Sequence, residues 1–464
     1  MTIPPLRPYQ KRDYRALRDA MRRHRRCVMV APTGYGKTRL AGELVLEERR
    51  AGRRVMMLCP WRELVGQAVD RFAAIGISAV GVMMSGYEPR PDAQVIVGSV
   101  ESVRQWIDVH PELAQVDVVI LDEAHRYGTE LRRGLLETTW AHARVVGITA
   151  TPFRAAAGGL GDLFDGLVVG ASMDELIEAG HLVPPRFWST DPRELATLRP
   201  LDGRPFERPS SARSVGDVLE EWQRHGLGTT LAFTSGVRAS RELAARFGRV
   251  GVAAEHLDAQ TPDVDRRAIL GRLAAGDTQV VCNHGVLTEG YDLPIVETII
   301  LRPTSSLMLY LQMVGRGLRP APGKTHCRVL DPAGLVYRFG LPQDYRLWSL
   351  DHAPTPRPLS EVAAREVRQL AEPARGGRDV EGRLAEVRGL PEDATAVLAR
   401  LEAQATASGY GAPWAVAEYR RRFGCPPPVP RLRRESRAWL KRQQVAAGLP
   451  APWVHERLRE LFGP

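Results

Sequence analysis

A glycine-rich turn near the N-terminus has the residue types needed to bind phosphate groups. Residues 31–38 read APTGYGKT and lie between an apolar run and a stretch with helical periodicity. Gly34 and Gly36 let backbone N–H groups close around phosphate oxygens, and the start of the helix adds partial positive charge. At this spacing Lys37 reaches the β- and γ-phosphates of a nucleotide and Thr38 holds Mg²⁺. The general pattern of such a loop is GxxxxGK[ST]. Residues 31–38 match it except at Ala31, which replaces the first glycine.

Two adjacent carboxylates, Asp122 and Glu123, follow the apolar run Val116–Leu121. Nucleotide sites in open α/β sheets form at the carboxyl ends of the strands, where this pair is expected to lie. Asp122 suits the Mg²⁺ shell, and Glu123 suits polarising an attacking water. Together with the phosphate loop, the pair predicts an ATP hydrolase that uses ATP and Mg²⁺.

Two arginines, Arg316 and Arg319, lie three residues apart in the second half of the chain. On a helix this spacing puts both on one face, where they can point together at a γ-phosphate. An arginine that neutralises charge on the transferred phosphoryl group is worth about 10³–10⁵ in rate. The phosphate loop and the arginines belong to two different domains of the chain, here called the first and the second lobe. Hydrolysis should therefore be fast only when the two lobes close.

These residues need two α/β domains to position them. Short apolar runs alternate with amphipathic helices over residues 1–170, which is typical of a doubly wound parallel sheet. Helices are predicted over residues 10–26 and Lys37–Arg50. The predicted strands are Cys27–Val30, Val55–Cys59, Val95–Val97, Val116–Leu121 and Val145–Thr149.

A second α/β pattern without a glycine-rich loop covers residues 214–350. The proline-rich segment 171–213, with one short helix, is predicted to connect the two domains. Residues 351–464 have helical periods broken by Pro and Gly and are predicted to form a mostly helical appendage. The strands predicted for the second domain are Thr230–Phe233, Val280–Cys282, Thr298–Leu301 and Cys327–Leu330, with a helix over Arg238–Phe247.

Composition and charge narrow the class of protein. The 464 residues include no apolar run of the roughly 20 residues that a membrane span needs, and no apolar secretory segment, so we expect a cytoplasmic protein without membrane contact. The five cysteines form no Cys-x-x-Cys pair, which argues against a zinc or iron–sulfur site. The net charge of +10 is concentrated at the two ends of the chain, as suits a polyanionic partner.

The motifs occur in one order over residues 6–335, and in that order the chain resembles a superfamily II helicase of the DEAD/DEAH-box type, closest to the restriction-motor and phage-helicase branch. The matching segments are residues 6–10 (LRPYQ), 31–38, 122–125 (DEAH), 147–152 (GITATP), 285–294 and 312–319 (QMVGRGLR). The resemblance implies two tandem RecA-like domains and an ATP-dependent DNA helicase or translocase.

The resemblance also implies roles for individual residues. Catalysis is assigned to Lys37, Asp122, Glu123, Gln312, Arg316 and Arg319, and metal binding to Thr38 and Asp122. Nucleotide contacts are assigned to Arg7, Gln10, Thr33, Gly34, Tyr35, Gly36, Lys37, Thr38, Gly290 and Asp292, with Gln10 reading the base. His125, Thr149 and Thr151 would couple the nucleotide state to lobe closure.

Nucleic-acid contacts are implied at the ends of strands on both lobes. The residues are Pro60, Trp61, Arg62, Gly98, Ser99, Thr234, Ser235 and Thr288. Small hydroxyl groups and exposed amides there suit gripping phosphates without reading sequence. Trp61 departs from the small hydroxyl residue usual at its position, and each hydroxyl could equally cap a helix.

The basic C-terminal tail has aromatic residues among its arginines, among them Trp414, Tyr419 and Trp439. These could stack on bases or could form the core of the small domain. Residues 414–426 faintly resemble a tail found in phage and prophage helicases of this group.

Three other functions are compatible with the same motifs. The chain could be a nucleotide-dependent clamp or remodeller that does not separate strands. It could be the motor subunit of a restriction or defence system, whose nuclease would be a separate subunit, because no Asp/Glu-x-Lys element occurs at any of its four lysines. An RNA helicase is the third alternative. DNA, single-stranded or forked, is the expected partner. Protein partners in repair, recombination, phage replication or defence stay open, and so does the oligomeric state, for which a monomer is plausible.

Overall fold

The computed structural model describes most of the first 352 residues and short pieces beyond them. It divides into two units, residues 1–388 and 389–464, of which the first holds both nucleotide-site motifs. The described residues are 5–128, 130–154, 158–190, 212–226, 228–288, 290–291, 293–344, 346, 348–352, 384–386, 401–402, 405, 414–416, 419 and 440.

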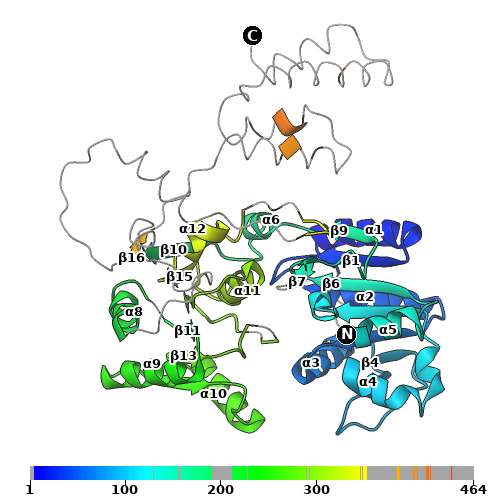
Figure 1. Ribbon diagram of the computed structural model, residues 1–464, viewed down its shortest axis with the longest axis horizontal. Helices are drawn as coiled ribbons and strands as arrows, with labels where there is room; N and C mark the ends of the chain where they lie inside the picture. The colour runs from blue at the N-terminus through cyan, green and yellow to red at the C-terminus, as the bar shows by residue number, and fades with distance from the viewer. Residues whose placement is uncertain are drawn as a thin grey trace. The chain divides into compact units, whose positions relative to one another are not determined.

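The first lobe, blue to cyan in Figure 1, is built on a seven-stranded, fully parallel sheet with the strand order β3-β4-β2-β5-β6-β1-β9. Its central strands β2 and β5 are buried at every position, as expected for β-branched and apolar runs covered on both faces. The strands are β1 (Arg26–Val30), β2 (Val55–Cys59), β3 (Val80–Met83), β4 (Val95–Ser99), β5 (Val118–Asp122), β6 (Arg144–Thr149) and β9 (Gly166–Val169).

Helices connect these strands, and one of the two helices predicted here has different ends. The helix predicted over residues 10–26 is α1, Pro8–Arg23, and Arg26 already begins β1. Pro8 occupies the first turn, where a missing N–H costs nothing, so the helix starts earlier than its apolar periodicity suggests. The others in this lobe are α2 (Lys37–Arg50), α3 (Arg62–Ala74), α4 (Val100–Ile107), α5 (Glu130–Glu137), and the 3₁₀ turns η1 (Pro111–Ala114) and η2 (Ala124–Arg126).

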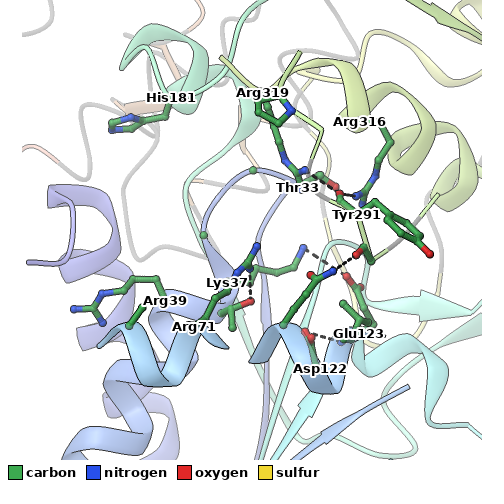
Figure 2. A pocket seen from close by; sticks show the side chains of 18 of the residues that line it. Thr33, Lys37, Arg39, Arg71, Asp122, Glu123, His181, Tyr291, Arg316 and Arg319 are labelled. Carbon is green, nitrogen blue, oxygen red and sulfur yellow. Dashed lines mark hydrogen bonds and ion pairs between the residues drawn. The ribbon is translucent and has the colours of Figure 1, made fainter. Parts of the chain in front are cut away.

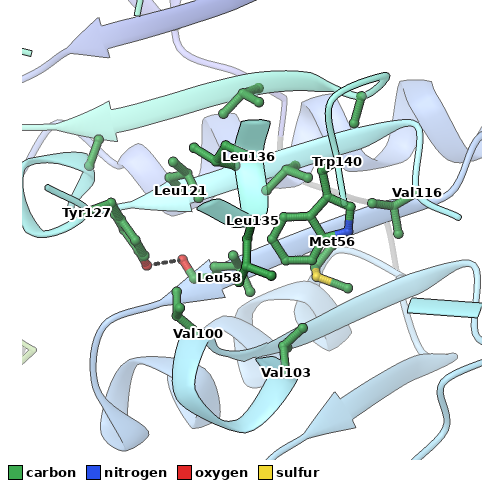
Figure 3. Packing of buried hydrophobic residues seen from close by; sticks show 14 of the residues in the cluster. Met56, Leu58, Val100, Val103, Val116, Leu121, Tyr127, Leu135, Leu136 and Trp140 are labelled. Atoms are coloured by element: carbon green, nitrogen blue, oxygen red, sulfur yellow. Dashed lines mark hydrogen bonds between the residues drawn. The ribbon is translucent and has the colours of Figure 1, made fainter. Parts of the chain in front are cut away.

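An apolar core fixes the strands around the carboxylate pair. Trp140 is 1% exposed and its indole N–H donates to the Leu113 carbonyl at 3.0 Å, which satisfies its polar atom inside the core. Tyr127 is also 1% exposed, and its hydroxyl donates to the Leu58 carbonyl at 2.8 Å (Figure 3). This bond ties the turn after β5 to the end of β2.

The second lobe repeats the architecture with the strand order β12-β13-β11-β14-β15-β10-β16. All its strands pair in parallel except β16, which runs antiparallel to β10. Two parallel-sheet α/β domains in tandem confirm the predicted fold class. The strands are β10 (Pro185–Thr190), β11 (Thr230–Phe233), β12 (Ala254–Leu257), β13 (Val280–Asn283), β14 (Thr298–Ile300), β15 (Cys327–Asp331) and β16 (Leu384–Glu386), and the helices are α8 (Ala212–His225), α9 (Val237–Arg249), α10 (Asp263–Ala275), α11 (Leu307–Gly317) and α12 (Leu335–Phe339).

The segment 171–213, predicted as a connection, contains regular structure. It begins with the short helix α6 (Met173–Glu178), and Pro185–Thr190 forms β10 beside β15. A small two-stranded sheet, β7 (Phe153–Arg154) with β8 (Gly158–Gly159), follows β6. The predicted helical appendage, residues 351–464, lies largely outside the described residues. No helix in the described part of the chain is long and apolar enough to cross a membrane.

Candidate functional site

The phosphate loop lies between β1 and α2, as its sequence predicts. The Ala31 N–H donates to the Thr149 carbonyl at 2.9 Å, so the loop starts against β6. Gly34 and Gly36 have φ values of 85° and 89°, in the left-handed region that favours glycine. A Cβ on Gly36 would lie 2.7 Å from the Gln10 side-chain nitrogen, so a larger residue would displace this side chain and would also be strained at this φ. The loop therefore keeps the backbone conformation that a phosphate cradle needs.

Residues of α1 brace this loop from behind. The Tyr9 hydroxyl and the Gln10 amide both donate to the Tyr35 carbonyl, at 2.9 and 3.1 Å. The Tyr35 side chain is fully buried and its hydroxyl donates to Asp13 Oδ2 at 3.0 Å. Asp13 also accepts the Ala171 N–H at 2.7 Å. Gln10 and Tyr35, predicted to contact the nucleotide, do not line the cleft described below; in this structure they hold the loop in shape.

The carboxylate pair lies at the carboxyl end of β5, opposite Lys37. Asp122 is buried, and burial together with the neighbouring Glu123 charge raises its pKa to about 7, against the opposing effect of Lys37. Glu123 has φ 48°, the only positive φ at a non-glycine residue in the described chain. Such backbone strain is typical of active sites. The Lys37 Nζ lies 3.9 Å from Glu123 Oε1, which brings the loop lysine to the acid predicted to act on water.

The three predicted coupling residues form one buried chain beside this acid. His125 Nδ1 lies 3.6 Å from Glu123 Oε2 and 2.9 Å from the Thr149 hydroxyl. The Thr149 hydroxyl in turn donates to the Thr151 carbonyl at 2.9 Å and lies 3.2 Å from the Thr151 N–H. Glu123 is thus connected to the segment after β6 by its contact with His125 and by the hydrogen bonds of the Thr149 hydroxyl.

The two arginines come from the second lobe, with a difference from the predicted geometry. Helix α11 ends at Gly317, so Arg316 is helical and Arg319 is beyond the helix, and the two do not share a helical face. Both guanidinium groups nevertheless converge, because Nη1 of each donates to the Tyr291 carbonyl, at 2.5 Å from Arg316 and 2.9 Å from Arg319. Of the other second-lobe predictions, Gln312 is buried in α11 and does not line the cleft, Gly290 does line it, and Asp292 lies outside the described residues.

Predicted residues of the two lobes line one cleft of about 550 Å³ (Figure 2). From the first lobe it is lined by the loop glycines and Lys37 and by the carboxylate pair, and from the second lobe by Gly290, Tyr291 and both arginines. Contacts from α3 reach the second lobe beside it. The Gln67 amide donates to the Gly290 carbonyl, and Glu63 pairs with Arg266 of α10 at 3.0 Å. Arg7, Thr33 and Thr38 also line the cleft.

Several cleft residues were not predicted from sequence, and Arg71 and His181 are two of them. Arg71 of α3 donates to the Thr38 hydroxyl at 2.9 Å, beside the predicted metal position. His181, after α6, lies with its ring 5.4 Å from that of Tyr9, and burial and Arg7 lower its pKa. No local motif marks either residue, because each reaches the cleft through a contact distant in sequence.

The site fits a nucleoside triphosphate and a divalent cation. The glycine loop has the two left-handed glycines that a phosphate cradle needs, and Asp122 is a buried carboxylate whose raised pKa a cation would reverse. Among the described residues, no cluster of three or more His, Cys, Asp or Glu could hold a metal without help. Mg²⁺ is commonly held by one or two protein oxygens plus substrate phosphates, which suits Thr38 and Asp122.

The predicted nucleic-acid contacts fall into two groups. Ser99 accepts the Ser102 N–H at 3.1 Å as the N-cap of α4, and Thr234 is buried with its hydroxyl donating to the Asn283 carbonyl at 3.0 Å. Both hydroxyls therefore make hydrogen bonds within the protein. For Ser99 this is the helix cap that the sequence offered as the alternative to a nucleic-acid contact. Trp61 and Ser235 are exposed. Pro60 and Arg62 flank Trp61, Gly98 precedes Ser99 at the end of β4, and Thr288 is half-buried.

Two protein families match this chain over successive segments. Residues 3–154 match the family described as type III restriction enzyme, res subunit, and residues 213–321 match the helicase conserved C-terminal domain. Together they cover more than half of the 464 residues. The first match contains the phosphate loop and the carboxylate pair, and the second contains both cleft arginines.

Relatives and solved structures agree with these matches. The chain is 28% identical over 327 residues to the 51.5 kDa protein of a Lactococcus phage (isolate 7-9), covering 69% of this chain and 68% of that one. It is 28% identical over 359 residues to IRC3 of Saccharomyces cerevisiae (strain ATCC 204508 / S288c), named as a candidate ATP-dependent helicase, covering 72% of this chain and 52% of the relative. The chain thus spans about half the length of IRC3.

The fold is similar to that of the DNA-bound ATP-dependent Type ISP restriction-modification enzyme LlaBIII. The TM-score is 0.56 at 17% identity, over 72% of this chain and 28% of that enzyme. At this identity the likeness concerns the fold alone. The two matched families, the ordered motifs around one cleft and the named relatives agree: the chain belongs to the superfamily II helicases, which use ATP.

Proposed function

We propose that this chain is an ATP-driven motor that moves along or unwinds DNA. The observation that carries the proposal is the composition of the cleft, in which Lys37 and Glu123 of one lobe face Arg316 and Arg319 of the other (Figure 2). A hydrolytic site divided in this way works only in one arrangement of the lobes. Hydrolysis is then coupled to lobe movement.

Each group has a chemical task in this proposal. Bound Mg²⁺ would neutralise charge between the β- and γ-phosphates, held by Thr38 and Asp122. Lys37 balances phosphate charge from the loop, and Glu123, held in a strained turn, orients the attacking water. Arg316 and Arg319 leave the Tyr291 carbonyl to stabilise the charge of the transferred phosphoryl group.

DNA as the partner is supported by relatives and by charge. The ATP-dependent DNA helicase Hel308 of Aeropyrum pernix (strain ATCC 700893 / DSM 11879 / JCM 9820 / NBRC 100138 / K1) is 28% identical over 151 residues, 30% of this chain and 20% of that helicase. LlaBIII, whose fold is similar, is described as bound to DNA. Basic residues concentrated at the chain ends suit the same partner.

A second candidate is the motor subunit of a restriction system, favoured by the type III restriction family match over residues 3–154. This function would use the same cleft and the same movement along DNA. It differs in requiring a separate nuclease subunit, because the sequence has no Asp/Glu-x-Lys element.

The test is ATP hydrolysis measured without nucleic acid and with single-stranded DNA, duplex DNA, forked DNA and RNA. We expect DNA to stimulate hydrolysis, and Lys37→Ala to lower the stimulated rate about 10²–10³-fold because transition-state charge loses a preorganised partner. Lys11→Ala, which removes an exposed lysine of α1, is the matched control and should keep the wild-type rate. Hydrolysis that no nucleic acid changes would contradict the proposal, and stimulation by RNA alone would reassign the substrate.

A further inference from the structure

A large aromatic side chain is exposed where β2 of the first lobe ends. Trp61 follows Cys59, the last residue of β2, by two positions, and 47% of its surface is exposed. Exposing a tryptophan forfeits much of the free energy that burial of its ring would supply. An indole that stays in water at the edge of a sheet is therefore a candidate contact for a ligand rather than part of the core.

The indole is held in place from two sides. Trp61 is the N-cap of α3, and its carbonyl accepts the Val65 N–H at 3.2 Å. The guanidinium of Arg126 lies 5.4 Å from the centroid of the indole ring, in cation–π distance. The backbone of Arg126 is held by its own N–H, which donates to the Glu123 carbonyl at 2.8 Å, and by the next residue, Tyr127, which is buried and bonded to the Leu58 carbonyl of β2 (Figure 3). The ring is thus presented by two strand ends that are tied together.

The surroundings of the ring are basic. Arg62, the next residue, donates to the Ser85 carbonyl at 3.0 Å and to its hydroxyl at 3.3 Å, which brings a second guanidinium to this edge. The neighbouring strand β4 ends at the same edge with Ser99. A partner that suits this surface must offer both negative charge and flat apolar groups. A nucleic-acid strand with unpaired bases has both, one per nucleotide.

We propose that Trp61, backed by Arg126, stacks on one unpaired nucleobase of the bound strand. The inference rests on the proposed nucleic-acid motor and makes its substrate more specific. Bases inside a duplex stack on one another and offer no free face, so this site takes a single strand or the unpaired arm of a fork. Arg126 comes three residues after Glu123 in the turn that follows β5. A base at Trp61 is therefore connected through Arg126 to the turn that carries the hydrolytic acid.

The experiment measures binding of the full-length protein to two fluorescently labelled strands of equal length. One is an oligonucleotide of thymidines, and the other has the same sugar–phosphate backbone with abasic positions. Trp61→Ala should weaken binding to the thymidine strand on the order of tenfold, since stacking contributes about that much per base. It should change binding to the abasic strand by less than about twofold, because that strand has no ring to stack. Trp61→Phe should recover most of the affinity for thymidines.

Tyr87→Ala is the matched control. It removes an aromatic side chain that is exposed to 46% on the same lobe, and it should leave both affinities unchanged. A thermal unfolding curve for each variant checks the fold. Three results would overturn the proposal: equal weakening on both strands, an equal loss of affinity in Tyr87→Ala, or no effect of Trp61→Ala. The exposed indole would then be assigned to a contact with a protein partner. If the wild-type protein binds neither strand, the proposed motor function fails as well, which separates the two failures.

Discussion

The residues of the hydrolytic site are divided between two lobes. Arg316 and Arg319 of the second lobe both line the cleft and both donate to the Tyr291 carbonyl. On the first lobe, Arg71 donates a hydrogen bond to the Thr38 hydroxyl. Each of these bonds joins groups that a bound nucleotide and its cation would engage. In the proposed motor, the nucleotide would therefore bind first, and hydrolysis would follow a rearrangement of these arginine contacts.

Replacing Arg316 tests this division of labour. Arg316→Ala should lower kcat for ATP hydrolysis about 10³-fold and leave KM for ATP little changed, because the phosphate loop still binds the ground state. Steady-state kinetics with saturating single-stranded DNA supplies both constants. Arg249→Ala, an exposed arginine at the end of α9, should match the wild type. A rise in KM with an unchanged kcat would mean that Arg316 binds the nucleotide in the ground state only.

At the scale of elements, the junction between β15 and α12 contains a buried acid far from the hydrolytic pair. Asp331 ends β15 and is fully buried; its Oδ2 accepts the Val336 N–H at 2.9 Å and the Ser189 hydroxyl at 3.2 Å. These bonds link α12 and β10 to β15. Burial raises the pKa of Asp331 to about 6, because the hydrogen bonds compensate only part of the lost hydration.

This raised pKa predicts how stability depends on pH. In the folded state Asp331 has a pKa of about 6, above the ordinary value of 3.8. Its contribution to the free energy of unfolding is therefore largest at low pH and is lost as the pH rises from 3.8 through about 6. The free energy of unfolding of the wild type relative to Asp331→Asn should fall by about 1–2 kcal/mol from pH 5 to pH 7. Urea denaturation at the two pH values measures it. A relative stability that rises with pH would contradict the assignment.

Elements also explain which parts of the fold could be predicted from sequence. Local signals were sufficient for the phosphate loop, α2 and β5, where a glycine turn or an uninterrupted apolar run determines the structure. β10 was missed because Pro184 and Pro185 make its segment read as a linker, while its strand conformation depends on pairing with β15 about 140 residues later. Arg71 and His181 were missed for the same reason. The convergence of Arg316 and Arg319 was predicted on a helical face but depends on the Tyr291 carbonyl.

At the scale of the whole molecule, the proposed motor needs two lobes that use one nucleotide. The first lobe supplies the phosphate loop and the carboxylates, the second supplies the arginines, and α3 contacts the second lobe through Gln67 and Glu63. If the lobes alternate between two arrangements during hydrolysis, a strand bound to both is moved along. A clamp would use the same cleft to change its grip without net movement.

The measurement that separates a motor from a clamp is the time the protein takes to reach the labelled end of a DNA strand. After mixing the prebound protein with ATP and Mg²⁺ in a stopped-flow instrument, a fluorophore at one end reports its arrival. For a motor we expect a lag before the signal at one of the two ends, and this lag should grow in proportion to strand length. Lys37→Ala should give no such signal. A signal that requires ATP but has no dependence on strand length would contradict movement along DNA and favour a clamp.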